Sequence, residues 1–227
     1  MVVLGIETSG QLGSVALRRA GRALNERVVP QRLGHGALLF VELKALFEEA
    51  GLRPADIDLV AVSQGPGSFT GLRIGLTAAR ATACALGRPL VGVPSLDVLA
   101  RNAPPDIPRV ATVLDAKRGD VYACIYGRRG SRLVRRTAYQ VVPAESLELP
   151  APCIVLGDAV ERYRPLLARQ GATLAPEETW RPRAAVVAQL GEALWRQGQR
   201  QELHAIEPLY LRRPEAEEVW ERKHGTG

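Results

Sequence analysis

The sequence predicts an α/β protein made of two subdomains. A meander of strands followed by a helix and a further strand fills the first half, and this order partly restarts after residue 108. Between the two copies, residues 102–108 read NAPPDIP, and the three prolines block regular structure there. We therefore expect one subdomain at 1–105, a second at 106–213, and a polar tail at 214–227.

In the first subdomain, short apolar segments predict strands and longer periodic ones predict helices. The turn at Gly21 separates two strands, and Gly51 and Gly87 mark the ends of two helices. Ser95 is placed to cap a third helix. The expected strands are 2–7, 13–20, 23–30, 59–64 and 90–93, and the expected helices are 34–50, 71–86 and 96–101.

The second subdomain gives a weaker version of the same pattern. Apolar segments separated by a turn at Gly119 predict a strand hairpin, and a periodic segment that ends near Gly198 predicts a helix. The tail from Pro214 is polar and should fray. The expected strands are 109–115, 121–126, 133–142 and 154–157, and the expected helix is 183–195.

Bulk composition is typical of a soluble globular protein: 46% of the 227 residues are hydrophobic and 24% are charged. The apolar runs are too short to span a bilayer, and no signal-peptide pattern opens the chain. Cys84, Cys124 and Cys153 lie far apart, which is typical of reduced thiols. We expect a cytoplasmic protein without membrane contact.

The net charge of +6 permits contact with nucleic acid. The basic residues are almost all arginine and are dispersed, with one exception. The exception is a cluster of five arginines, which either contacts RNA or forms the solvated face of a hairpin. The sequence leaves both possibilities open. The cluster consists of Arg128, Arg129, Arg132, Arg135 and Arg136.

The most informative motif is a glycine-rich turn at residues 62–75, which reads VSQGPGSFTGLRIG. Gly65, Gly67 and Gly71 permit a sharp turn between a strand and a helix. The motif is not a P-loop, because Leu72 and Arg73 stand where that loop needs Lys and Ser or Thr. It also lacks the glycine spacing of a dinucleotide-binding loop. We interpret the glycines as structural.

Four segments together resemble the bacterial TsaB (YeaZ) family. They are GPGSFTGLRIGLTAARATACALGRPLVGVPSLDVLA at 65–100, VLGIETSGQLGSVAL at 3–17, LDAKRGDVYACIY at 114–126 and PLYLR at 208–212. The resemblance implies an actin/Hsp70/sugar-kinase-like (ASKHA) fold. It also implies a non-catalytic subunit of the complex that adds threonylcarbamoyl to the adenosine beside the anticodon of tRNA. The implied partners are the catalytic paralogue TsaD, the ATPase TsaE and, through the complex, tRNA.

Actin-like ATPases hold phosphates between two hairpin turns, and both turns can be located here. Glu7 stands where active relatives carry Asp, and Lys117 and Arg118 replace the glycines expected in the second turn. We expect plain turns and no cofactor on the isolated chain, with ATP used by the complex. The weak candidates for nucleotide contact are Glu7, Thr8, Ser9 and Asp115.

Metal and covalent chemistry have little support. His35, His204 and His224 include no pair at helical i, i+4 spacing, and no Cys-x-x-Cys occurs. Ser68 and Thr70 are better interpreted as helix caps than as nucleophiles. We therefore expect no metal and no catalytic residue.

The two long helices of the first subdomain carry more apolar residues than one buried face needs. Either both helices are buried between layers, or their second face binds a partner, which includes a second copy of the chain. The resemblance favours a partner interface. Its expected residues are Leu38, Val41, Ala45, Leu72, Gly75, Leu76, Ala78, Ala79 and Thr82.

Two other classes of function stay open. The chain could be a free-standing enzyme of the actin-like fold, either a sugar-type kinase or a metallopeptidase, or it could be an independent RNA-binding protein.

Overall fold

The computed structural model describes residues 1–30 and 35–212 of the chain. It contains two mixed sheets, each with its own core, which confirms the predicted α/β class with two lobes. The expected polar tail at 214–227 lies outside the described residues, as does His224. None of the described helices is long and apolar enough to cross a membrane.

The first lobe is built on a five-stranded sheet with the order β3-β2-β1-β4-β5. Its first three strands form the expected antiparallel meander, and β4 and β5 then add in parallel. β1 is buried along its whole length, as its apolar sequence indicated. The strands are β1 (Val2–Glu7), β2 (Gly13–Arg19), β3 (Arg22–Val29), β4 (Leu59–Gly65) and β5 (Leu90–Pro94).

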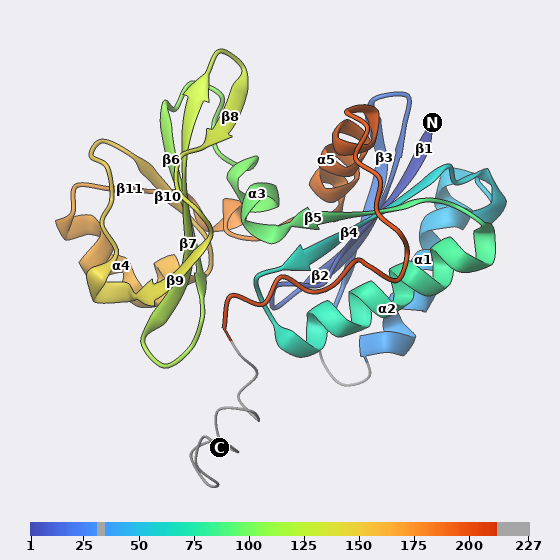
Figure 1. Ribbon diagram of the computed structural model, residues 1–227, viewed down its shortest axis with the longest axis horizontal. Helices are drawn as coiled ribbons and strands as arrows, with labels where there is room; N and C mark the ends of the chain where they lie inside the picture. The colour runs from blue at the N-terminus through green and yellow to red at the C-terminus, as the bar shows by residue number, and fades with distance from the viewer. Residues whose placement is uncertain (31–34, 213–227) are drawn as a thin grey trace, which may run out of the picture.

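Helices cover both faces of this sheet (Figure 1). α1 (His35–Ala50) and α2 (Phe69–Leu86) lie on one face, and α5 (Ala184–Arg196) lies on the other. Ser68 caps α2, because its hydroxyl accepts the Gly71 amide at 3.2 Å. The helix ends at Gly87, whose φ of 61° suits glycine.

The second lobe carries a six-stranded sheet with the order β11-β10-β6-β7-β8, and β9 also pairs with β7. α3 (Ser95–Ala100) connects the two lobes, and α4 (Ala159–Arg169) packs on the second sheet. Short 3₁₀ turns lie at Pro54–Asp56, Ala144–Ser146 and Glu177–Thr179. The strands are β6 (Arg109–Asp115), β7 (Asp120–Arg129), β8 (Arg132–Arg135), β9 (Gln140–Pro143), β10 (Ile154–Leu156) and β11 (Thr173–Leu174).

Two expectations for the second lobe need correction. The single strand expected at 133–142 is two strands. β8 pairs with the C-terminal half of β7, and β9 pairs with the N-terminal half. α4 and β11 were not expected. α4 contains Pro165, a residue that usually ends a helix, and a non-helical Tyr163, while β11 has only two residues.

The expected range of 106–213 for the second subdomain is too long. α5 packs on the first sheet, where backbone and side chains approach closely: a Cβ on Gly5 would lie 2.2 Å from the Ala184 carbonyl oxygen. The chain after α5 stays on the first lobe, where the Leu209 amide donates to Gln64 O at 2.6 Å. Arg212 then reaches the second lobe and pairs with Asp120 at 2.8 Å.

Candidate functional site

The glycine-rich turn packs directly on the first hairpin turn, between β1 and β2. The Ser68 amide donates to Ser9 O at 2.8 Å. A Cβ on Gly67 would lie 2.3 Å from Ser9 O, and one on Gly71 would lie 2.1 Å from Thr8 O. Backbone occupies the space that an anion would need, so the turn has a packing role and does not form an anion site.

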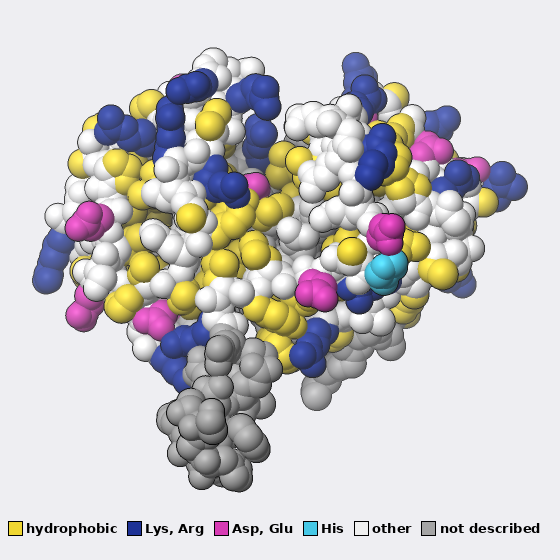
Figure 2. Space-filling view, viewed as in Figure 1, with side chains coloured by type: hydrophobic (Ala, Val, Ile, Leu, Met, Phe, Trp, Pro, Cys, Tyr) yellow, Lys and Arg dark blue, Asp and Glu magenta, His cyan; other side chains and the backbone are white. Residues whose placement is uncertain are grey.

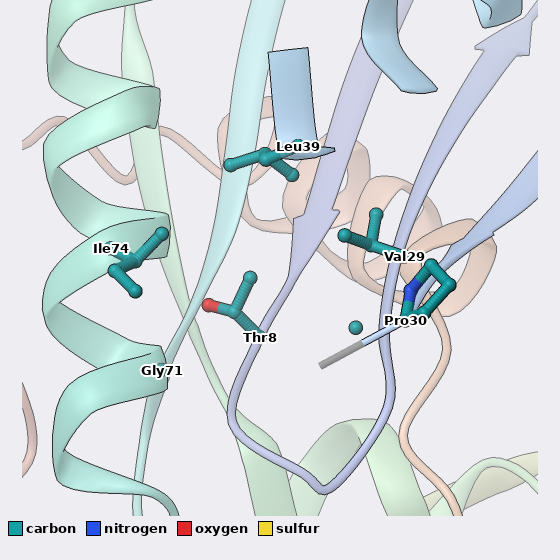
Figure 3. A pocket seen from close by; sticks show the side chains of 7 residues that line it. Thr8, Val29, Pro30, Leu39, Gly71 and Ile74 are labelled. Atoms are coloured by element: carbon teal, nitrogen blue, oxygen red, sulfur yellow. The ribbon is translucent and has the colours of Figure 1, made fainter. Parts of the chain in front are cut away.

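Thr8 does not face the cleft between the lobes. Figure 3 shows its hydroxyl directed toward α2, where a Cβ on Gly75 would lie 2.1 Å from Oγ1. This oxygen is buried, and no described residue forms a hydrogen bond with it. The adjacent cavity measures ≈ 10 Å³, which is about the space of one water molecule, so Thr8 cannot contact a nucleotide there.

Glu7 is fully buried, and its carboxyl group accepts hydrogen bonds from the hairpin turn that follows it. Oε1 accepts the Ser9 amide at 2.5 Å and the Ser9 hydroxyl at 2.6 Å. Oε2 is buried and, among the described residues, has no hydrogen-bond donor within 3.5 Å in good geometry. Burial raises the pKa of Glu7, although the two Ser9 hydrogen bonds act in the opposite direction. The Ser9 amide of this turn is therefore already bound to the Glu7 carboxyl group and is not free to bind a phosphate.

The second hairpin turn, between β6 and β7, repeats the arrangement. Oδ1 of Asp115 accepts the Lys117 amide at 2.8 Å, and Oδ2 pairs with the Lys117 ammonium at 2.8 Å. Burial raises the pKa of Asp115, but the bonds to Lys117 outweigh it and the net shift is downward. In each turn, a backbone amide thus donates to the carboxyl group of the residue two positions earlier, as in an Asx turn.

A small pocket with a mainly acidic lining lies between the lobes. Its volume is ≈ 40 Å³, far below the several hundred Å³ of typical ligand pockets. The second-lobe side carries Asp158, Glu161 and Glu177 opposite Gln11 of the first turn. Burial raises the pKa of Asp158, although its bond from the Asp115 amide lowers it. The volume of this pocket and its three carboxylates, which Arg181 offsets only in part, suit a nucleoside triphosphate poorly.

Glu7→Gln is expected to stabilise the protein at neutral pH. Because burial raises the folded-state pKa of Glu7, the folded protein binds that proton more tightly than the unfolded chain does, and stability falls as pH rises above the ordinary carboxyl range of about 4.5. Glutamine keeps the acceptor for Ser9 and removes the buried charge. Thermal melts between pH 4 and 8 should show the largest gain at the alkaline end. A gain that is equal at every pH, or a loss at neutral pH, would contradict this account.

A much larger opening lies between α1 and α2, on the outer face of the first lobe. This interhelical groove has a volume of ≈ 620 Å³. Its floor and walls are mainly apolar, with Lys44, Glu48 and Arg53 at the charged positions. Phe40 at its margin is 53% exposed, and the adjacent Val41 is 58% exposed. The groove is lined by Leu4, Phe40, Leu43, Lys44, Phe47, Glu48, Leu52, Arg53, Pro54, Ala81, Thr82, Ala85 and Leu86.

Most of the expected interface residues do not line this groove. Five of them are buried inside the lobe, so the prediction of an accessible interface at those positions needs correction: Leu72, Gly75, Leu76, Ala78 and Ala79. They face the sheet and the first hairpin turn. Thr82 does line the groove, Leu38 and Ala45 are half-buried, and Val41 is exposed.

Sequence reasoning missed the accessible stripe of α2. Ala81 and Ala85 are exposed, lie four residues apart and form one wall of the groove. Phe40 and Phe47 were recognised as apolar but were not chosen as contact residues. The available signal was a third apolar row on α2, beside the two rows that fold into the core.

Residues proposed for other chemistry have local structural roles. Ser68 caps α2, and His204 lies 3.1 Å from the exposed Glu202. Within the described residues, no group of three His, Cys, Asp or Glu side chains is placed to hold a metal. Thr70 is exposed on the first turn of α2.

Two lobes with equivalent hairpin turns across a cleft define an ASKHA-type α/β protein. Component A of the (R)-2-hydroxyglutaryl-CoA dehydratase of Acidaminococcus fermentans shares this fold, with a TM-score of 0.51 over 85% of this chain and 98% of that one, at 11% identity.

The family follows from closer matches. The family model described as TsaD, tRNA N6-adenosine threonylcarbamoyltransferase, matches residues 28–220. The tRNA threonylcarbamoyladenosine biosynthesis protein TsaB of Bacillus subtilis is 28% identical, over 97% of this chain and 98% of that protein. YeaZ from Pseudomonas aeruginosa superposes with a TM-score of 0.80 at 28% identity, over 92% of this chain and 99% of that one. The chain belongs to the TsaB (YeaZ) family, which confirms the resemblance.

Proposed function

We propose that this chain is a non-catalytic scaffold subunit of a tRNA N6-threonylcarbamoyladenosine synthase. It would act in the cytoplasm by pairing with the catalytic paralogue TsaD, and the ATPase TsaE would join them. The observation that carries this proposal is the interhelical groove. An apolar opening of ≈ 620 Å³ beside an exposed phenylalanine needs a partner to cover it.

The catalytic paralogue is a suitable occupant. The TsaD family model matches this chain over residues 28–220, which include α1 and α2. A relative with corresponding helices can place its own helix pair against this one and form a four-helix contact. A second copy of the chain can do the same, so a homodimer would compete with the heterodimer.

The two hairpin turns support a non-catalytic role. The Ser9 and Lys117 amides are bound by Glu7 and Asp115 of the same turns, so neither turn offers a free amide at these positions for a phosphate. ATP would therefore be hydrolysed by the ATPase partner, and the scaffold would act by ordering the catalytic subunit. A kinase or metallopeptidase function is the alternative.

Reconstitution tests the proposal. The chain, the catalytic paralogue and the ATPase of the same organism would be purified without chelator and assayed with tRNA, ATP and a supplied threonylcarbamoyl donor, because none of the three is proposed to make that donor. We expect co-elution of this chain with the paralogue, and modification that drops at least tenfold when the chain is left out. Full modification without the chain would contradict the proposal. ATP turnover or one zinc or iron per isolated chain would favour the enzyme alternative.

A further inference from the structure

A charged surface lies on the second lobe, on the opposite half of the molecule from the groove. Lys and Arg side chains gather around β8, at the free end of the second sheet (Figure 2). Five of the six arginines are exposed, and Arg128 is half-buried. The arginine patch consists of Arg101, Arg128, Arg129, Arg132, Arg135 and Arg136.

The strand register fixes these side chains close together. Arg129 pairs directly with Arg132 across the hairpin, which places two like charges on one face. Arg136 lies over Gly127, where the missing side chain leaves room for its guanidinium. Arg128 is held by bonds from its guanidinium to Ile107 O and Pro104 O, both at 2.9 Å. The hairpin therefore presents a fixed array of cations.

The patch arginines lack the carboxylate partners that some other arginines of the same chain possess. Arg18 pairs with Glu192 at 2.7 Å, and Arg27 pairs with Glu42 at 2.6 Å. Arg183 and Arg212 likewise hold carboxylates. Among the described residues, none of the six patch arginines forms an ion pair within 4.0 Å. Exposed arginines elsewhere, such as Arg19 and Arg169, also form no ion pair within 4.0 Å among the described residues, so the distinguishing feature of the patch is the number of arginines that one hairpin holds together.

One carboxylate, that of Asp97, acts on the patch from α3, and its Oδ1 accepts the Tyr126 hydroxyl at 2.7 Å. Partial burial lowers the pKa of Arg101; Asp97 raises it, and the charges of Arg128 and Arg132 lower it further. Mutual repulsion of this kind costs free energy unless an anion binds the surface.

We propose that the arginine patch binds the phosphate backbone of RNA. The inference rests on the proposed function, in which the complex modifies tRNA, and it assigns this lobe the task of holding that tRNA. Guanidinium groups match phosphate oxygens in bidentate geometry. Arg135 is additionally oriented by Tyr139, whose ring centroid lies 4.4 Å from Cζ. An anionic membrane is a poorer match, because Val134 is the exposed large apolar residue of the hairpin and is only 36% exposed.

The test is binding of a fluorescent tRNA transcript to the full chain across a salt series. The triple variant Arg129→Ala/Arg132→Ala/Arg136→Ala removes three exposed patch charges. The matched control Arg19→Ala/Arg22→Ala/Arg169→Ala removes three exposed charges elsewhere. For the patch variant, we expect the slope of log K against log salt to fall by about 2 to 3 units, with about tenfold or greater loss of affinity near physiological salt. The control should bind as the wild type does.

Each other outcome overturns the inference. Equal losses in both variants would indicate a general charge effect, and unchanged binding in the patch variant would place the RNA elsewhere. Absence of tRNA binding with patch-dependent binding to phosphatidylserine vesicles would assign the surface to a membrane. Co-elution of the patch variant with the catalytic paralogue separates this inference from the proposed scaffold function. If the variant pairs normally and also binds tRNA normally, RNA binding by the patch is refuted and the scaffold function is not.

Discussion

Leu76→Arg is expected to prevent folding of the first lobe. Leu76 is 2% exposed and belongs to the core between α2 and the first sheet. An arginine there would bury an unpaired charge, which costs roughly 3–5 kcal/mol beyond the lost packing of about 2–5 kcal/mol. That sum is comparable with the ~5–15 kcal/mol by which a domain of this size is stable. Circular dichroism and soluble yield should both report the loss.

Thr77→Arg is the matched control, because Thr77 is the adjacent exposed residue of the same helix. It should melt within a few degrees of the wild type. Ala78→Arg should behave like Leu76→Arg, since Ala78 is 4% exposed. A folded Leu76→Arg variant that has lost only partner binding would restore the residue to the interface and contradict the core assignment made here.

The strands with continuous apolar sequence were predictable almost to the residue. β1 and β6 have their expected bounds, because apolar runs ended by polar or turn residues leave few alternatives. The position of α5 was not predictable in the same way. Its periodic pattern gives a helix, but only the close approach of Gly5 to Ala184 and of Gly191 to Ala61 shows which sheet it covers.

The sequence predicted which two helices carry the candidate site, but not which face of each helix is accessible. An excess of apolar residues on α1 and α2 indicates a partner surface, yet a helix pattern alone does not say which stripe faces the sheet. Gly75 was expected at the interface, and in the structure its missing side chain leaves room for Thr8 of the first hairpin turn. Glu7 was recognised as unusual, but its bonds to Ser9 depend on a turn geometry that the sequence does not show.

Ala85→Arg is expected to abolish pairing with the catalytic paralogue while leaving the fold intact. Ala85 is exposed and forms part of the groove wall, so an arginine can extend into solvent in the isolated chain. In a complex of standard size, which buries about 1,600 Å² in total, the same side chain would be enclosed by apolar groups. An unpaired charge there costs about 3 kcal/mol or more, which weakens association by roughly a hundredfold.

The measurement is isothermal titration of the paralogue into each variant, alongside thermal melts. Ala81→Arg, one helical turn earlier on the same wall, should reproduce the loss. Ala168→Arg places the same charge on an exposed alanine of α4 in the second lobe, away from the groove, and should bind as the wild type does. Any homodimer formed through the groove should dissociate in the two groove variants and persist in the control. If both groove variants pair normally, α1 and α2 are not the docking surface, and the scaffold mechanism loses the observation that carries it.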